Sequence, residues 1–208
     1  MLDGISSKHI EQVVEHFSSL PGIGKKTALR FALHLLKKES EDVSNFGEAL
    51  IAMRESIQYC SECHNISDEP ICSICSNPNR SQSIICVVQD IRDVIAIENT
   101  NSFRGKYHVL GGIISPMDGI GPNDLNIDSL VEKVSQRNKE EIILALPATM
   151  EGDTTNFYLY KKLKDFDVKI TTIAKGVSIG DDIQYTDQLT LGRSIMNRTI
   201  FDQSVNIR

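Results

Sequence analysis

The sequence of 208 residues contains no tryptophan, few aromatic residues and no long apolar segment. A membrane-spanning helix needs about 20 consecutive apolar residues, so we expect no membrane span. The opening residues, MLDGISSKHIEQ, lack the basic start and apolar stretch of a secretory signal peptide, and we therefore expect a cytoplasmic protein. The glycine-rich segment 111–121 lacks the Gly-Lys-Ser/Thr of a Walker A loop and gives no evidence for phosphate binding.

Positive charge is also in short supply. The chain has 22 basic and 28 acidic residues, a formal net charge of −6 and a pI near 5.4. Its 40% hydrophobic and 24% charged residues are typical of a globular protein, which excludes the disordered and fibrous classes. A negative net charge weighs only weakly against a nucleic-acid partner, because phosphate is met by local charge and by aimed backbone amides.

Four of the five cysteines form one pattern. Cys60-x2-Cys63 and Cys72-x2-Cys75 are two CxxC pairs separated by eight residues. In a reducing compartment such cysteines are better explained as metal ligands than as disulfides. Four thiolates can converge at the corners of a tetrahedron, and a complete thiolate set favours structural over catalytic zinc. We therefore predict one structural Zn²⁺ on these four residues; the alternatives are four unrelated thiols or a redox CxxC, which needs no second pair.

Two residues beside this pattern are given other roles. His64 follows Cys63 directly, but four thiolates already complete a zinc site, so we expect His64 to be a surface residue of the turn. Cys86 stands alone in the apolar run 84–88, where we expect a buried thiol in the core.

The N-terminal part predicts helices joined by a glycine turn. Between the first two apolar stripes, Gly22 and Gly24 allow a tight turn in which Ile23 packs into the helix junction. Such a turn leaves its own amides and the first amides of the next helix pointing outward, which is an anion-binding feature. The three stripes are Ile10, Val13, Val14 and Phe17; Leu29, Ala32, Leu33 and Leu36; and Phe46, Leu50, Met53 and Ile57.

The same segment concentrates positive charge. Residues 17–38 contain five basic residues and no acidic one, so they are locally +5 in a chain of −6. The turn resembles a helix-hairpin-helix motif, which binds the DNA backbone without reading bases; the alternative is a purely structural hairpin. Lys37 and Lys38 fit the C-terminal end of the helix. The predicted DNA contacts are Gly22, Gly24, Lys25, Lys26 and Arg30.

After the cysteines, apolar strands alternate with helical segments. This alternation predicts a mostly parallel sheet with helices on both faces and functional loops at the carboxyl ends of the strands. The expected strands are 83–88, 107–110, 142–146 and 168–173, and the expected helices are 93–99, 128–137, 154–165 and 186–195.

This region resembles a Toprim domain, in which a Glu after the first strand and a later Asp-x-Asp hold Mg²⁺. Here Gln89 stands at the Glu position, and Pro147 and Thr149 stand at the two Asp positions. Magnesium is therefore a doubtful cofactor, and we expect no catalytic residues. The acids that remain as a residual cluster, able to hold Mg²⁺ only loosely, are Asp90, Glu151 and Asp153.

The order of these parts and the strings LPGIGKKTALRFALHLL, YHVLGGIISPMDGIGP and MEGD closely resemble the RecR family of recombination mediators. The resemblance implies a non-enzymatic DNA-repair factor that acts with RecO and RecF to load RecA on single-stranded gaps. It also implies dimers and ring-shaped tetramers that encircle DNA. Gln89 and Pro147 depart from the family, and Gln89 puts in doubt any role of that acid in metal binding or in RecO contact.

We therefore expect an α+β chain in four parts. These are a helix-hairpin-helix region at 1–58, a four-cysteine zinc finger at 59–80, a Toprim-like α/β domain at 81–178 and a C-terminal helix and tail at 179–208. Two other functions remain as alternatives. One is a Mg²⁺-dependent nuclease or topoisomerase-like enzyme, which the missing acids disfavour, and the other is a protein-interaction adaptor whose hairpin no longer binds DNA.

Overall fold

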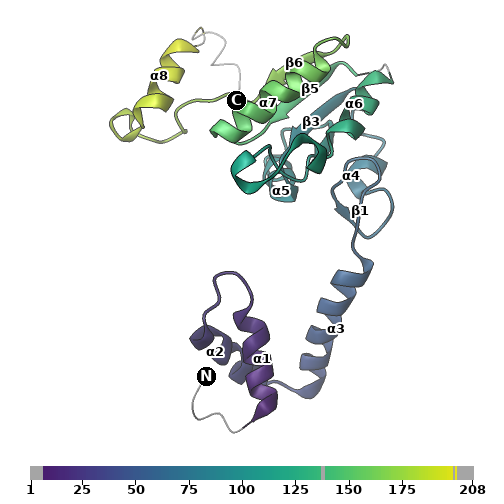
Figure 1. The fold of residues 1–208 in the computed structure, drawn as a ribbon, viewed down its shortest axis with the longest axis vertical. Coiled ribbons are helices and arrows are strands. Elements are labelled where there is room, and N and C mark those ends of the chain that lie inside the picture. The colour runs from purple at the N-terminus through teal and green to yellow at the C-terminus, as the bar shows by residue number, and fades with distance from the viewer. Residues whose placement is uncertain (1–6, 137–138, 199, 201–208) are drawn as a thin grey trace. The chain divides into compact units, whose positions relative to one another are not determined.

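The computed structural model describes residues 7–136, 139–198 and 200. The chain divides into two compact units, residues 1–57 and 58–208 (Figure 1). Most of the predicted C-terminal tail, residues 199 and 201–208, lies outside the described residues. No helix in the described part of the chain is long and apolar enough to cross a membrane.

The first unit consists of three helices, α1 (Lys8–Ser18), α2 (Lys25–Leu35) and α3 (Ser40–Ser56). The apolar stripes of α1 and α2 meet in a small core centred on Val14, Ala28 and Ala32. Ile23, between the two turn glycines, packs against this core as the sequence predicts. The stripe on α3 marks a helix correctly, although α3 itself has no buried residue.

The second unit begins with a short, cysteine-rich region. Strands β1 (Gln58–Tyr59) and β2 (Ile66–Ser67) form an antiparallel pair, and helix α4 (Ser73–Ser76) follows. These elements are only two to four residues long, so the region has little regular structure of its own.

A four-stranded parallel sheet forms the main part of the second unit. Its strands lie in the order β4-β3-β5-β6, and every neighbouring pair is parallel. The sheet and its helices confirm the predicted α/β domain. The bounds are β3 Ile84–Val88, α5 Ile91–Asn99, β4 Lys106–Val109, α6 Ile127–Ser135, β5 Glu141–Ala145, α7 Met150–Leu163, β6 Lys169–Thr172 and α8 Gln188–Met196, with 3-10 turns at Pro116–Asp118, Pro122–Asp124 and Ile183–Tyr185.

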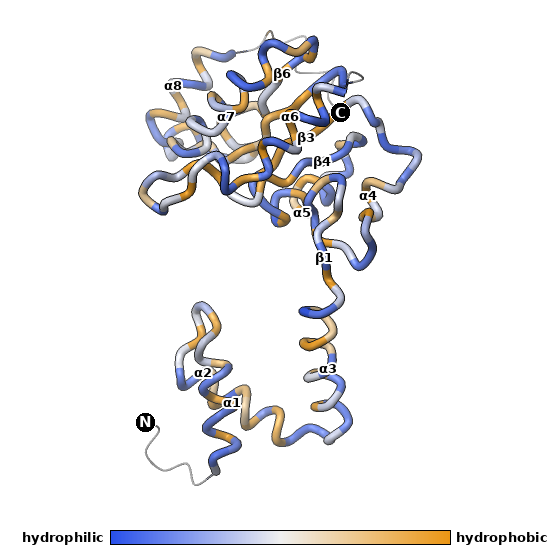
Figure 2. Tube along the Cα trace, turned by 45° about the vertical axis from the view of Figure 1, so that its right-hand side comes forward, coloured by the Kyte–Doolittle hydropathy of each residue, from blue (hydrophilic) through white to orange (hydrophobic). Residues whose placement is uncertain are grey.

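Both faces of the sheet are buried, as expected for parallel strands covered by helices. Ile85 and Val87 of β3 pack on the face covered by α6 and α7, whereas Cys86 and Val88 pack on the face covered by α5. Figure 2 shows the hydrophobic character of these central strands. Cys86 is the buried core thiol that the sequence predicts, and burial raises its pKa to about 12.

The start of α7 lies unusually close to the loop that precedes it. Thr149 is the N-cap residue, and its hydroxyl accepts a hydrogen bond from the Gly152 amide at 3.1 Å. A Cβ atom on Gly152 would overlap the carbonyl oxygen of Pro147. Only glycine therefore allows the helix to approach the carboxyl end of β5 this closely.

We expect Gly152→Ala to lower the free energy of unfolding by about 1–3 kcal/mol, because the added methyl group must push a rigid carbonyl aside. Urea denaturation followed by circular dichroism measures this change. Gly192→Ala in α8 is the matched control, because its added Cβ meets no atom within 4 Å. Alanine there should stabilise the helix by about 0.5–1 kcal/mol. Equal stability of the two variants would contradict the close approach at Gly152.

Candidate metal centre and nucleic-acid interface

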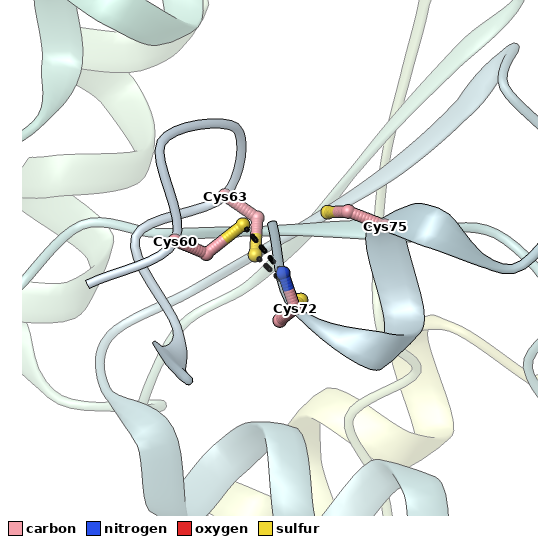
Figure 3. A group of neighbouring side chains, drawn as sticks. All are labelled: Cys60, Cys63, Cys72 and Cys75. Atoms are coloured by element: carbon pink, nitrogen blue, oxygen red, sulfur yellow. Dashed lines mark hydrogen bonds between the residues drawn. The ribbon is translucent and has the colours of Figure 1, made fainter. Parts of the chain in front are cut away.

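Two turns bring four cysteines together in the second unit. Cys60 and Cys63 lie in the turn after β1. Cys72 is the N-cap residue of α4, and Cys75 lies within that helix. All four side chains are buried, and their sulfur atoms lie within 4.8 Å of one another. Figure 3 shows Cys75 pointing from α4 toward the other three residues. Among the residues that the structure describes, only these four gather their ligand atoms closely enough to hold a metal ion.

The spacing of the sulfurs fits a tetrahedral zinc site. The Cys63 and Cys72 sulfurs lie 3.6 Å apart, and the Cys72 amide donates a hydrogen bond to the Cys60 sulfur at 3.3 Å (Figure 3). A Zn–S bond of about 2.3 Å places tetrahedral sulfurs about 3.8 Å apart. With all four sulfurs within 4.8 Å of one another, the cluster has the size that a four-thiolate zinc site requires.

The protonation of the cysteines also fits a metal site. Hydrogen bonding with Cys75 lowers the pKa of Cys63 to about 6, which favours its thiolate form. The same hydrogen bond raises the pKa of Cys75, and burial raises the pKa of Cys72 to about 11. A dication at the centre stabilises all four residues as thiolates, which is the form that binds zinc.

His64 differs from its prediction as an exposed residue of the turn. It does lie in a turn, with a left-handed φ of 62°, but its side chain is half-buried. The imidazole Nε2 lies 2.9 Å from the Ser129 hydroxyl, and the ring meets His108 edge to face. Burial lowers the pKa of His64, with a further contribution from Lys133. His64 is therefore a contact between the cysteine region and α6, and its partners are too distant in sequence to be predicted.

Strand β4 provides two further contacts with the cysteine region. The Val109 amide donates a hydrogen bond to the Cys63 carbonyl oxygen at 2.8 Å. The Lys106 ammonium forms an ion pair with the Glu62 carboxylate at 3.1 Å. The turn that carries two of the cysteines is thus attached directly to the parallel sheet.

In the first unit, the predicted glycine turn contains a left-handed backbone conformation that favours glycine. The Ile23 amide donates to the Leu20 carbonyl at 3.1 Å, and Gly22 has a positive φ of 76°. Pro21 precedes Gly22, which matches the Pro-Gly preference of a type II turn. Gly24 is extended and forms the N-cap of α2.

The start of α2 is open to an anion. Within the described residues, no side chain caps this helix, so the amides of its first turn face outward. Lys25, Lys26 and Arg30 are all exposed. Lys26 and Arg30 are four residues apart and share one face of the helix. The arrangement combines backbone N–H donors, the positive end of the helix and exposed basic side chains. Together these suit one phosphate group of a nucleic-acid backbone.

The acids that remain in the Toprim-like domain do not gather into a metal site. Asp90 caps α5 and forms an ion pair with Arg92, which lowers the pKa of Asp90. Asp153 lies 2.6 Å from the Lys175 ammonium and 3.8 Å from Arg193.

The surroundings of these acids also differ from a magnesium site. Glu151 is exposed in the first turn of α7. A cavity of about 570 Å³ at the carboxyl ends of the strands is lined by Lys175 and Arg193. Two cations therefore stand beside Asp153, where a magnesium-dependent enzyme needs clustered carboxylates.

Four family models match successive parts of the chain. They describe the helix-hairpin-helix of RecR over residues 10–54, the four-cysteine zinc finger domain of RecR over 57–77, a Toprim domain over 83–174 and the C-terminal part of RecR over 176–199. The zinc-finger match and the sulfur cluster together identify zinc as the cofactor of this region.

Whole-chain relatives agree with these matches. A protein named Recombination protein RecR from Porphyromonas gingivalis is 57% identical, and the alignment covers 99% of each chain. Proteins of the same name from Parabacteroides distasonis and Flavobacterium psychrophilum are 60% and 57% identical. These alignments cover 93% of both chains in the first case, and 96% of this chain and 97% of the relative in the second.

We expect Cys63→Ala to lose zinc and Cys86→Ala to retain it. Removal of one of four thiolates should lower zinc affinity by more than about tenfold, since even changes outside the ligand set cost 10–100-fold. Cys86 is the matched control because it is an equally buried cysteine that packs in the sheet core. Zinc content after gel filtration, measured with a chromogenic chelator, tests the pair. Full zinc content in Cys63→Ala, or equal loss in both variants, would contradict the assignment.

Proposed function

Because the chain belongs to the RecR family, we propose that it binds the DNA backbone without sequence preference and acts as a non-enzymatic mediator of recombinational repair. The helix-hairpin-helix, zinc-finger and Toprim matches and the full-length relatives support a role in recombination. The single observation that carries the DNA-binding proposal is the Gly22–Gly24 turn at the open start of α2, with Lys25 and Lys26 exposed beside it.

The proposed mechanism is a set of weak, equivalent contacts. One hairpin offers backbone amides and a few cations to a single stretch of phosphates, which gives modest affinity. Assembly of several chains as a dimer or ring-shaped tetramer would present several hairpins to the same DNA. Linked weak contacts raise overall binding by roughly 10²–10⁴-fold without any new contact. Such an assembly would let an acidic chain hold DNA firmly while reading no bases.

The resemblance to RecR extends this proposal to partners. We propose that the chain works with RecO and RecF to promote RecA loading on single-stranded gaps, in the cytoplasm at the nucleoid. The absence of an acid at Gln89, Pro147 and Thr149 supports a binding role over phosphoryl transfer, since Mg²⁺ needs carboxylate ligands. If the purified chain nicked supercoiled DNA with Mg²⁺, and Glu151→Ala abolished the nicking, the enzyme alternative would replace this proposal.

We expect the double variant Lys25→Ala/Lys26→Ala to bind single-stranded DNA roughly tenfold more weakly. The negative slope of log K against log salt should also become shallower by about 1.5, because binding releases fewer counterions when two phosphate contacts are lost. Fluorescence anisotropy with an unstructured oligonucleotide, titrated at several salt concentrations, gives both quantities. The mass in solution must match that of the unmodified chain, so that a change of assembly is not mistaken for a lost contact.

The matched control is Lys37→Ala/Lys38→Ala. These lysines belong to the same basic segment and are equally exposed, but they follow the opposite end of α2. Their loss should change affinity by less than about threefold, since they do not adjoin the open amides. Equal losses in both double variants would indicate a diffuse basic surface and contradict a phosphate contact at the hairpin. Unchanged binding by both would place the DNA contact elsewhere on the chain, and no DNA binding by the unmodified chain at low salt would favour the adaptor alternative.

A further inference from the structure

Lys133 on α6 extends into the region that carries the cysteines. Its half-buried ammonium donates hydrogen bonds to the carbonyl oxygen of Glu62 and to Nδ1 of His108, the latter at 2.9 Å. Glu62 lies between Cys60 and Cys63 in the first CxxC turn. The lysine therefore connects the helix directly to the backbone that presents two of the zinc ligands.

His108 holds the ammonium in place without adding charge. The ring is completely buried, and its Nε2 lies 2.6 Å from the carbonyl oxygen of Asn126. A carbonyl only accepts hydrogen bonds, so Nε2 carries the proton and Nδ1 offers its lone pair to Lys133. Burial lowers the pKa of His108 to about 3, which keeps the ring neutral.

Lys133 has no carboxylate partner among the described residues. None of their ion pairs includes it, and the nearby Glu62 carboxylate pairs with Lys106 instead. A buried ammonium without a negative partner is costly. Burial lowers the pKa of Lys133, and the negative charges of Cys63, Cys75 and Cys60 oppose that shift most strongly. Lys133 also lines a cleft of about 420 Å³ together with Cys75, which places its side chain beside the cysteine cluster.

Four thiolates around one Zn²⁺ leave a net charge of −2 in a buried site. We propose that Lys133 is the counter-ion of this zinc centre, a positioning residue whose fixed ammonium offsets the excess thiolate charge and so retains the metal. It acts through the sulfur ligands and does not contact the metal. Because Lys133 belongs to α6, retention of zinc in the cysteine region becomes linked to the folding of the adjoining α/β domain.

The test compares zinc-loaded full-length chains. Lys133→Met keeps an unbranched side chain only one atom shorter and removes its charge, and we expect zinc transfer to a chromogenic chelator to be roughly tenfold faster. Lys133→Arg should restore a rate within about threefold of the unmodified chain, because it returns the charge. Lys139→Met is the matched control, since Lys139 lines the same 420 Å³ cleft but donates to the Gln82 carbonyl.

Cobalt substitution provides a readout that packing alone would not change. In the Co²⁺-loaded Lys133→Met chain, the thiolate-to-metal charge-transfer band should move to longer wavelength, because the sulfur electrons lose a nearby positive charge. Lys133→Arg and Lys139→Met should leave the band in place. If Lys133→Met does not fold, Lys133→Gln replaces it with the same two expectations.

Three results would overturn the proposal. One is an unchanged release rate and an unchanged cobalt band in the variant without charge at position 133. Another is equal acceleration of zinc transfer in Lys133→Met and Lys139→Met, which would show that the overall charge of the cleft, and not Lys133 in particular, retains the metal. The third is failure of Lys133→Arg to restore zinc retention. DNA binding through the hairpin is measured separately, so its outcome does not depend on these results.

Discussion

The cysteine region at the start of the second unit depends on the convergence of four cysteine sulfurs within 4.8 Å. As thiolates these groups repel one another in a buried site, and a dication at their centre reverses that repulsion. The surrounding elements are two strands of two residues and one helix of four. Such short elements bury too little apolar surface to fold alone, so the metal centre supplies their core. This region is attached to β4 through Val109 and Lys106 and to α6 through Ser129.

Much of the fold could be predicted because its signals are local. Alternating apolar runs and helical segments indicated the parallel sheet, and the continuous apolar run at Ile84–Val88 corresponds to a strand buried on both faces. The spacing of the two CxxC pairs was sufficient to predict the cysteine cluster. The Pro-Gly-x-Gly turn was equally informative, since Gly22 adopts the positive φ that such a turn requires.

The remaining features depend on contacts between residues far apart in the chain. The environment of His64 is set by Ser129 and His108, and no spacing rule connects these positions. The resemblance to a Toprim domain predicts a residual acidic cluster, but Asp90 caps a helix and Asp153 pairs with Lys175. The cap is a local pattern, because Arg92 and Asp93 lie within three residues of Asp90, whereas Lys175 is 22 residues from Asp153 and no spacing rule connects the two.

The hydrogen bond from Val109 to the Cys63 carbonyl has a consequence for self-association. Strand β4 lies at one end of the sheet order, and an edge strand presents unpaired amides that can recruit a strand from another chain. The Cys63 carbonyl accepts a hydrogen bond from one of those outward amides, that of Val109. The Glu62 carboxylate pairs with Lys106 of the same strand. The zinc finger therefore covers part of the edge strand β4. We expect a chain that loses its metal to expose this edge to pairing with other chains and to aggregate more readily.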